Sequence, residues 1–177
     1  MTYLEQYFHA IEAGEIIVGQ ELYGLLIKLI AEMQDPRYRY ETKKAHRRIK
    51  FIELFCKHTK SPFNGKPFLL ELWEKAFIEV TYSFIKVSTG YRRFKKIILL
   101  ISRKNGKSTL AAGMAFSELM IGNGGSDIVC SSNDDGQASI IFQEIGSMRE
   151  MFDPNDKRTH KNLRWILNKK NKSKVFK

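Results

Sequence analysis

The sequence predicts an α/β fold in which a helical N-terminal region precedes the start of a parallel β-sheet. Three observations indicate this fold class. The first third of the chain repeats apolar residues at helical spacing, the part after Gly90 alternates short aliphatic runs with amphipathic segments, and 43% of the 177 residues are hydrophobic. Such a chain is long and apolar enough for one domain or a domain with an extension, and a disordered chain is excluded.

Four helices are expected in the N-terminal half, where apolar residues recur three or four positions apart, as at Leu22, Leu25 and Leu29. They are placed at 3–13, 18–33, 42–58 and 69–84. A turn-rich segment, 61–67, separates the last two. We place the boundary between a helical region and the sheet-containing region there, giving residues 1–64 and 65–177.

The C-terminal half alternates strands and helices. The aliphatic run Phe94–Ser102 predicts a strand buried on both faces, because strands of parallel sheets are covered by helices on each side. The expected elements that follow are a helix at 107–121, a strand at 127–131, a helix at 134–151 and weaker strands at 163–167 and 174–176. This order predicts an incomplete three-layer αβα arrangement.

Positive charge is concentrated in three stretches of the chain. The sequence has 30 Lys and Arg against 19 Asp and Glu, a formal net charge of +11. Residues 37–50, 91–107 and 160–177 hold 21 of these 30 cations and only one acid, Glu41. A concentrated positive field attracts phosphate or nucleic acid, although solvated helix faces are the alternative explanation.

Several other classes of protein are disfavoured. Cys56 and Cys130 are too few for a disulfide framework, and no metal-binding spacing of cysteine or histidine is found. The longest aliphatic run, Ile97–Ile101, is too short to span a bilayer, and no signal peptide is recognised at the N-terminus. We therefore expect a cytoplasmic protein that does not bind membranes.

The loop after the first predicted strand carries a phosphate-binding motif. Gly106-Lys107-Ser108 matches the end of a Walker A loop, in which backbone N–H groups face phosphate oxygens at a helix N-terminus. Lys107 would reach the β- and γ-phosphates, and the Ser108 hydroxyl would ligate Mg²⁺. The sequence thus predicts a site for ATP and Mg²⁺ formed by Ser102, Asn105, Gly106, Lys107, Ser108 and Thr109.

A polar strand-to-helix turn in which Ser108 only caps the helix is the alternative explanation for this loop. The aliphatic run before the loop and the small-residue helix after it favour the phosphate-binding interpretation. One feature departs from the general GxxxxGKS pattern, because Ile101 stands where the first glycine is expected.

The loop sequence, Ser-Arg-Lys-Asn-Gly-Lys-Ser at 102–108, resembles the variant Walker A loop of large terminase subunits, the DNA-packaging motors of tailed bacteriophages. In that family an arginine follows a small residue where other P-loops have glycines, so the missing glycine at Ile101 is expected. Supporting similarities cover nearly the whole chain, at segments 11–16, 48–53, 65–74, 91–94 and 131–138. The fold implied is that of a P-loop NTPase.

The resemblance implies roles for three further residues. Arg103 corresponds to an arginine thought to reach the γ-phosphate and couple it to movement, and with Lys107 it forms the expected catalytic pair. Trp73 and Glu74 correspond to an aromatic residue and a glutamine that contact adenine. Glu74 is a departure, because an ionised carboxylate cannot donate to a ring nitrogen. A surface Arg103, and a core Trp73 beside a surface Glu74, are the alternatives.

A second departure concerns hydrolysis. The resemblance implies a Walker B strand ending in Asp-Glu, a coupling motif and a nuclease domain, and none of these is recognised in the sequence. Asp134-Asp135 follows a polar stretch and is interpreted as a helix start. We therefore expect residues 1–177 alone to bind nucleotide with little or no hydrolysis.

The function implied by the resemblance is that of the ATP-binding part of a motor that couples ATP hydrolysis to DNA translocation into the procapsid. The implied partners are double-stranded DNA, the portal protein, the small terminase subunit and further copies in a homo-oligomeric ring, and the implied location is the procapsid portal in the bacterial host. The alternatives are a nucleic-acid-binding module without ATPase activity, another P-loop NTPase such as a helicase, and an inactive prophage remnant.

Overall fold

The structure, a computed structural model, describes the backbone of residues 1–177 and every side chain except that of Asp135. It consists of two compact units. Unit 1 comprises Met1–Ile49 and Leu70–Ile98, and unit 2 comprises Lys50–Leu69 and Leu99–Lys177. Each unit therefore draws on two separate stretches of the chain, while the expected domain boundary between residues 64 and 65 stays a prediction.

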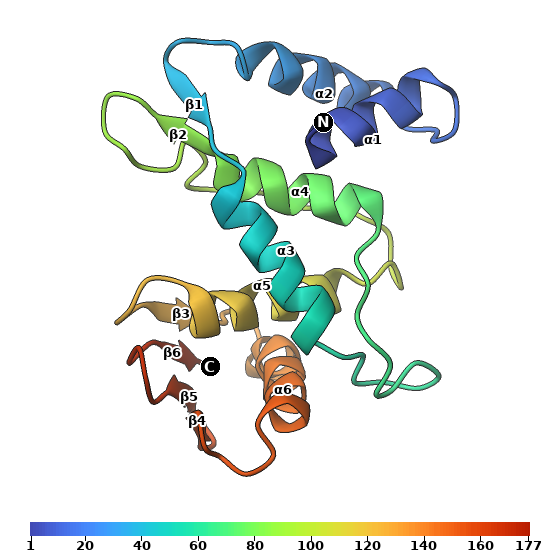
Figure 1. The fold of residues 1–177 in the computed structure, drawn as a ribbon. Helices are drawn as coiled ribbons and strands as arrows, with labels where there is room; N and C mark the ends of the chain where they lie inside the picture. The colour runs from blue at the N-terminus through green and yellow to red at the C-terminus, as the bar shows by residue number, and fades with distance from the viewer. The chain divides into compact units, whose positions relative to one another are not determined.

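Unit 1 contains α1 (Tyr3–Glu12), α2 (Gln20–Glu32), α4 (Leu72–Ser83) and the first part of α3 (Lys43–Phe55) (Figure 1). Each of these helices lies within a segment predicted to be helical, so the four predictions are confirmed. A capping box begins α1: the Thr2 hydroxyl accepts from Glu5 N at 3.2 Å, and the Glu5 carboxylate accepts from Thr2 N at 2.6 Å. The buried apolar core of the unit is formed by Leu4, Tyr7, Leu26, Leu29, Ala76 and Phe84.

A short antiparallel pair of strands in unit 1 is absent from the sequence-based prediction. β1 (Tyr38–Tyr40) pairs with β2 (Phe84–Lys86), with Tyr40 opposite Phe84 and their rings 4.8 Å apart. The helix predicted to reach Phe84 ends at Ser83 instead. Three-residue strands are too short to show the two-residue alternation that reveals a strand, so pairing between distant segments decides the structure here.

Unit 2 contains α5 (Lys107–Ile121), α6 (Asp135–Phe152) and a four-stranded sheet. The sheet order is β3 (Asp127–Val129), β6 (Lys174–Phe176), β5 (Trp165–Asn168) and β4 (Thr159–Lys161). β3 and β6 are parallel, with Ile128 opposite Val175, whereas the β6–β5 and β5–β4 pairs are antiparallel. The α/β class and a parallel pair are thus confirmed, and the sheet is mixed rather than wholly parallel.

Helix α5 packs against both α6 and the sheet (Figure 1). The end of α5 is tied to the turn after β5, because the side-chain amides of Asn168 and Asn171 each donate to Leu119 O at 3.0 Å. These bonds satisfy a carbonyl that a helix end leaves without an intrahelical donor. The buried apolar side chains of the unit include Leu110, Phe116, Leu119, Phe142, Ile145, Met148, Ile166 and Val175.

The predicted strand Phe94–Ser102 is not formed in the structure. None of its residues lies in a strand, and Ile98 and Leu100 are 83% and 89% exposed. An extended segment becomes a strand only when it forms hydrogen bonds with a neighbouring strand. In the described backbone the sheet of unit 2 consists of β3, β6, β5 and β4, and residues 94–102 are not part of it. Phe94 instead packs on Phe84 of unit 1, with ring centroids 5.6 Å apart.

Candidate nucleotide-binding site

The loop at 102–109 leads directly into α5. Helix α5 begins at Lys107, and Gly106 precedes it as the N-cap with φ of 73°, a left-handed conformation that glycine adopts without strain. The first helical hydrogen bond is donated by Leu110 N to Gly106 O at 2.9 Å. The N–H groups of Lys107, Ser108 and Thr109 therefore precede it, in the part of a helix where N–H groups have no intrahelical acceptor. Such N–H groups form an anion-binding position at a helix N-terminus.

The side chains of this loop differ in their contacts. The Lys107 ammonium donates to Ile101 O at 3.3 Å, and the Asn105 amide donates to the Ser102 hydroxyl. Both contacts join the start of the loop to its end, so the loop closes on itself. Arg103 is exposed in the turn. The remaining predicted residues, Ser108 and Thr109, are half-buried in the first turn of α5.

A buried glutamate next to this turn was not predicted from the sequence. The Oε1 atom of Glu144, on α6, accepts from Thr109 Oγ1 at 3.3 Å and from Thr59 Oγ1 at 2.5 Å, and Oε2 pairs with Lys60 Nζ at 3.2 Å. The sequence did contain a signal, because Glu144 lies three residues after Ile141 and four before Met148, on the expected apolar face of the helix.

The two residues expected to contact adenine belong to unit 1, whereas the loop at 102–109 belongs to unit 2. Glu74 is buried and its Oε2 accepts from Glu71 N at 2.9 Å, as part of the cap of α4. Burial raises the pKa of Glu74 above its ordinary value, an effect that the Glu71 N–H partly opposes. Trp73 is half-buried against the apolar core of unit 1. The expected adenine contacts stay a prediction.

The polar residues that follow β3 form the start of α6. The Asp134 carboxylate accepts from Gln137 N at 3.2 Å, and the Ser132 hydroxyl donates to Gln137 Oε1 at 3.3 Å. Asp134 is therefore the N-cap of α6, which confirms the interpretation of this segment as a helix start. Among the side chains that the structure describes, no group of three or more His, Cys, Asp or Glu could hold a metal ion.

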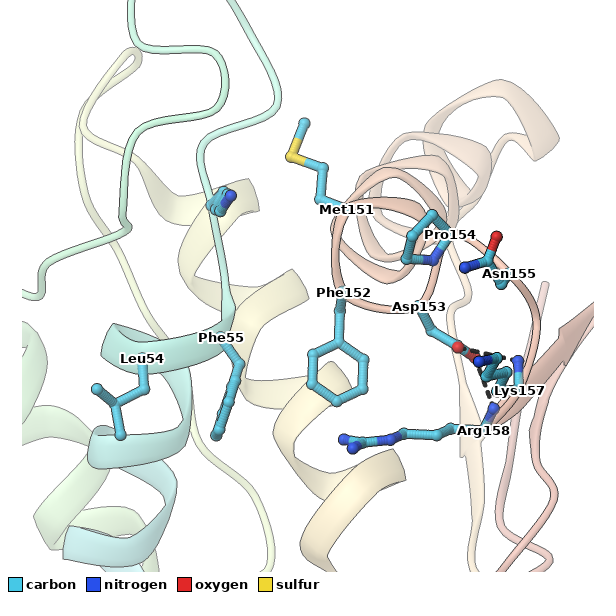
Figure 2. A pocket seen from close by; sticks show the side chains of 10 residues that line it. Leu54, Phe55, Met151, Phe152, Asp153, Pro154, Asn155, Lys157 and Arg158 are labelled. Atoms are coloured by element: carbon cyan, nitrogen blue, oxygen red, sulfur yellow. Dashed lines mark hydrogen bonds between the residues drawn. The ribbon is translucent and has the colours of Figure 1, made fainter.

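A pocket of about 400 Å³ opens in unit 2 between the ends of α3 and α6 (Figure 2). Leu54, Phe55 and Phe152 form its apolar side, and the Arg158 guanidinium lies 5.4 Å from the Phe152 ring centroid. Lys57, Lys157 and Arg158 are the basic residues that line the pocket. No residue of the loop at 102–109 lines the pocket, so it is separate from the predicted nucleotide site.

Asp153, which also lines this pocket, accepts hydrogen bonds from the backbone that follows α6. Its carboxylate accepts from the N–H groups of Lys157 and Arg158 at 3.0 and 2.9 Å (Figure 2). It also accepts from the N–H group of Thr159 at 2.8 Å. Burial alone would raise the pKa of Asp153, but the hydrogen bonds from Thr159 and from the backbone outweigh it and hold the pKa below its ordinary value.

The basic residues lie mostly at the surface. In the stretch 37–50 all cations except Arg48 are exposed, and Arg48 is buried with its guanidinium 4.3 Å from the ring centroid of Tyr82. Arg93, in the second stretch, is half-buried and pairs with Glu32. None of the helices in the described chain has both the length and the apolar character needed to cross a bilayer.

Comparison with known proteins gives two matches. The family model of the terminase large subunit, ATPase domain, matches residues 72–176, more than half of the chain. The crystal structure of the HK97 bacteriophage large terminase is similar with a TM-score of 0.62 and 25% sequence identity. That similarity covers 75% of this chain and 26% of the HK97 chain, so the present sequence spans about a quarter of its length. No curated protein matches the chain.

Proposed function

Because this chain belongs to the family of the terminase large subunit ATPase domain, we propose that it binds ATP and Mg²⁺ through the loop at 102–109. The observation that carries the proposal is the start of α5, where left-handed Gly106 precedes free N–H groups and Lys107 lies over the loop backbone. In the complete motor, this site would couple ATP hydrolysis to translocation of double-stranded DNA through the portal into the procapsid. The small subunit and further copies in a ring are the other proposed partners.

Each residue of the loop has a proposed task. The N–H groups of the first turn of α5 bind phosphate oxygens, and the Lys107 ammonium leaves Ile101 O for the β- and γ-phosphates. The half-buried Ser108 hydroxyl is the proposed protein ligand of Mg²⁺, which when bound would neutralise charge on the phosphates. Exposed Arg103 is the proposed coupling residue, so Arg103→Ala should reduce DNA translocation by a complete motor more than it reduces nucleotide affinity.

Residues 1–177 alone should hydrolyse ATP slowly. Hydrolysis needs a carboxylate or amide that orients the attacking water, in addition to phosphate binding. Glu144 is a buried carboxylate that contacts Thr109 of the loop, and its oxygens are already paired with two threonine hydroxyls and Lys60. Slow turnover with intact binding is the expected result of a phosphate-release assay on the purified chain.

A calorimetric titration of Mg-ATP into the chain tests the binding proposal. Lys107→Ala should weaken binding roughly tenfold to hundredfold, because a charge-assisted contact to phosphate is lost. Lys104→Ala is the matched control, an exposed lysine of the same loop, and should change affinity less than about threefold. Equal affinities for the wild type and both variants would contradict the proposal.

The exposed cations favour one second function, a nucleic-acid-binding module that needs no nucleotide. Such a module would bind DNA with an affinity that falls steeply with salt, because phosphate contacts release counterions. Its DNA affinity would be indifferent to Lys107→Ala, and no Mg-ATP binding would be measured. DNA titrations at two salt concentrations, with and without Mg-ATP, distinguish the two functions.

A further inference from the structure

The Glu144 carboxylate, on α6, has partners from two other segments of unit 2. Its side chain is 3% exposed, and it contacts Thr59 and Lys60 from the segment after α3 and Thr109 from α5. A buried carboxylate without partners is costly, so these contacts are needed for the arrangement to persist. Both threonine hydroxyls donate to the same atom, Oε1, whereas Lys60 contacts Oε2.

The contact with Thr109 links this carboxylate to the nucleotide site. Thr109 lies two residues after Lys107, in the same helical turn as the N–H groups proposed to bind phosphate. We propose that Glu144 is a positioning residue, which holds the first turn of α5 in the orientation that nucleotide binding requires by accepting the Thr109 hydroxyl. This inference rests on the proposed function of the loop at 102–109.

The same contact assigns different tasks to two adjacent hydroxyls. Successive side chains of an α-helix point about 100° apart, so the Ser108 and Thr109 hydroxyls leave α5 in different directions. The Thr109 hydroxyl donates to Glu144 of α6. Ser108 is therefore the hydroxyl left for Mg²⁺, and the role of Thr109 is independent of the metal.

The hydrogen bonds, rather than the ion pair, carry this positioning. The Lys60 side chain is 69% exposed, and an ion pair with such an exposed partner contributes little. Thr59 and Thr109 are both half-buried, so their hydroxyls have less access to water. A neutral glutamine at position 144 keeps an oxygen that can accept from both hydroxyls, whereas methionine, of similar size, has only a weakly accepting sulfur.

Titrations of ATP into the 1–177 chain and its variants, with Mg²⁺ and with EDTA, test the inference. Glu144→Met and Thr109→Val should each weaken ATP binding roughly fivefold to tenfold, and Glu144→Gln should stay within about twofold of the wild type. The effect of Thr109→Val should be the same in both buffers, whereas Ser108→Ala should weaken binding only with Mg²⁺. Thr109→Val should have no further effect in the Glu144→Met background.

Glu150→Gln is the matched control for these variants. Glu150 is also on α6, but its side chain is 58% exposed and pairs with Lys161 at 2.8 Å, so its loss should leave ATP affinity unchanged. Circular dichroism establishes that each variant is folded at the temperature of the titration. If Glu144→Met does not fold, the milder Thr109→Val decides the question.

Three results would overturn these assignments, and they are distinguishable. A wild type that binds no ATP overturns the proposed function and the positioning role together. A wild type whose binding is weakened by Lys107→Ala but unaffected by Glu144→Met and Thr109→Val overturns the positioning role alone. Variants that unfold at lower temperature but bind ATP like the wild type also overturn it, because Glu144 would then only stabilise the fold.

Discussion

Each unit of the molecule contains a buried glutamate that joins distant segments, and the partners of the two carboxylates differ in kind. In unit 1, Glu79 accepts from Leu4 N at 3.0 Å and Tyr40 Oη at 2.9 Å, and it contacts His46 Nε2 at 2.5 Å. In unit 2, Glu144 accepts from two threonine hydroxyls and pairs with Lys60. Glu79 therefore connects structural elements, whereas Glu144 also contacts the turn that carries Lys107.

This difference shows that burial of a carboxylate does not by itself indicate a functional role. Glu79 holds the start of α1 and the β1 strand against α4. Burial raises the pKa of Tyr40, and the charge of Glu79 raises it further. None of its partners belongs to a motif with a chemical task. The partner set, and not the burial, is what assigns Glu144 to the nucleotide site.

The largest expected effect is on unit 1. Glu79→Leu leaves the Leu4 N–H, the Tyr40 hydroxyl and His46 without their acceptor, and should lower the free energy of unfolding by about 3 kcal/mol. Urea unfolding measures this loss. Glu15→Leu, at an exposed site, is the control and should change stability by less than about 0.5 kcal/mol. If Glu79→Leu lowers the free energy of unfolding by less than about 1 kcal/mol, Glu79 does not have the structural role that distinguishes it here from Glu144.

A second test concerns a buried carboxylate of unit 2 whose partners are, like those of Glu79, structural. Asp153→Ala removes the acceptor of three backbone N–H groups and of the Thr159 hydroxyl. It should lower the free energy of unfolding by about 2 kcal/mol at neutral pH. Because the pKa of Asp153 is lowered in the folded state, its stabilisation is present above the unfolded pKa of about 3.9 and lost as the pH falls through the lower folded value.

The pH dependence gives this prediction a second measurement. Urea unfolding of the wild type and Asp153→Ala should give free energies that differ most near neutral pH and converge in acid. ATP affinity should be unaffected, because Asp153 lines a pocket that no residue of the loop at 102–109 enters. A difference that stays constant down to the lowest pH would mean that the ionised carboxylate is not the stabilising species.

The sequence predicts local features of this molecule better than contacts between distant segments. The six α-helices of the described backbone begin and end within three residues of the predicted limits, and the Gly106-Lys107 start of α5 follows from the motif alone. The burial of Glu144 could be inferred from its place on the apolar face of its helix. Its partners, and the β1–β2 pair, come from segments far apart in sequence, and hydrophobic periodicity does not show which distant segments meet. The aliphatic run before the loop has the composition of a buried strand, but only a neighbouring strand makes it one.

A smaller effect is expected at Glu74 of unit 1. Because burial raises its pKa, Glu74 costs stability above the folded pKa, and this cost disappears as the pH falls toward the unfolded pKa. Glu74→Gln keeps an oxygen for Glu71 N–H and removes the buried charge, so it should raise the free energy of unfolding by about 0.5 kcal/mol at neutral pH and leave it unchanged in acid.

The same variant sharpens the expected role of position 74 in adenine binding. Glutamine can donate as well as accept, so Glu74→Gln should strengthen binding of ATP relative to GTP if this side chain reaches the base. An unchanged ratio of the two affinities, together with the stability increase, would leave Glu74 with its observed role as a cap of α4 and nothing more.

The smallest expected effect tests the departure of unit 2 from its predicted sheet. Leu100 is 89% exposed, so Leu100→Ala should change the free energy of unfolding by less than about 0.5 kcal/mol. Leu110→Ala, at a fully buried site of α5, is the control and should lower the free energy of unfolding by about 3 kcal/mol. Similar losses for both variants would mean that residues 94–102 form the buried strand that their composition predicts, and that the loop at 102–109 follows a strand of the sheet.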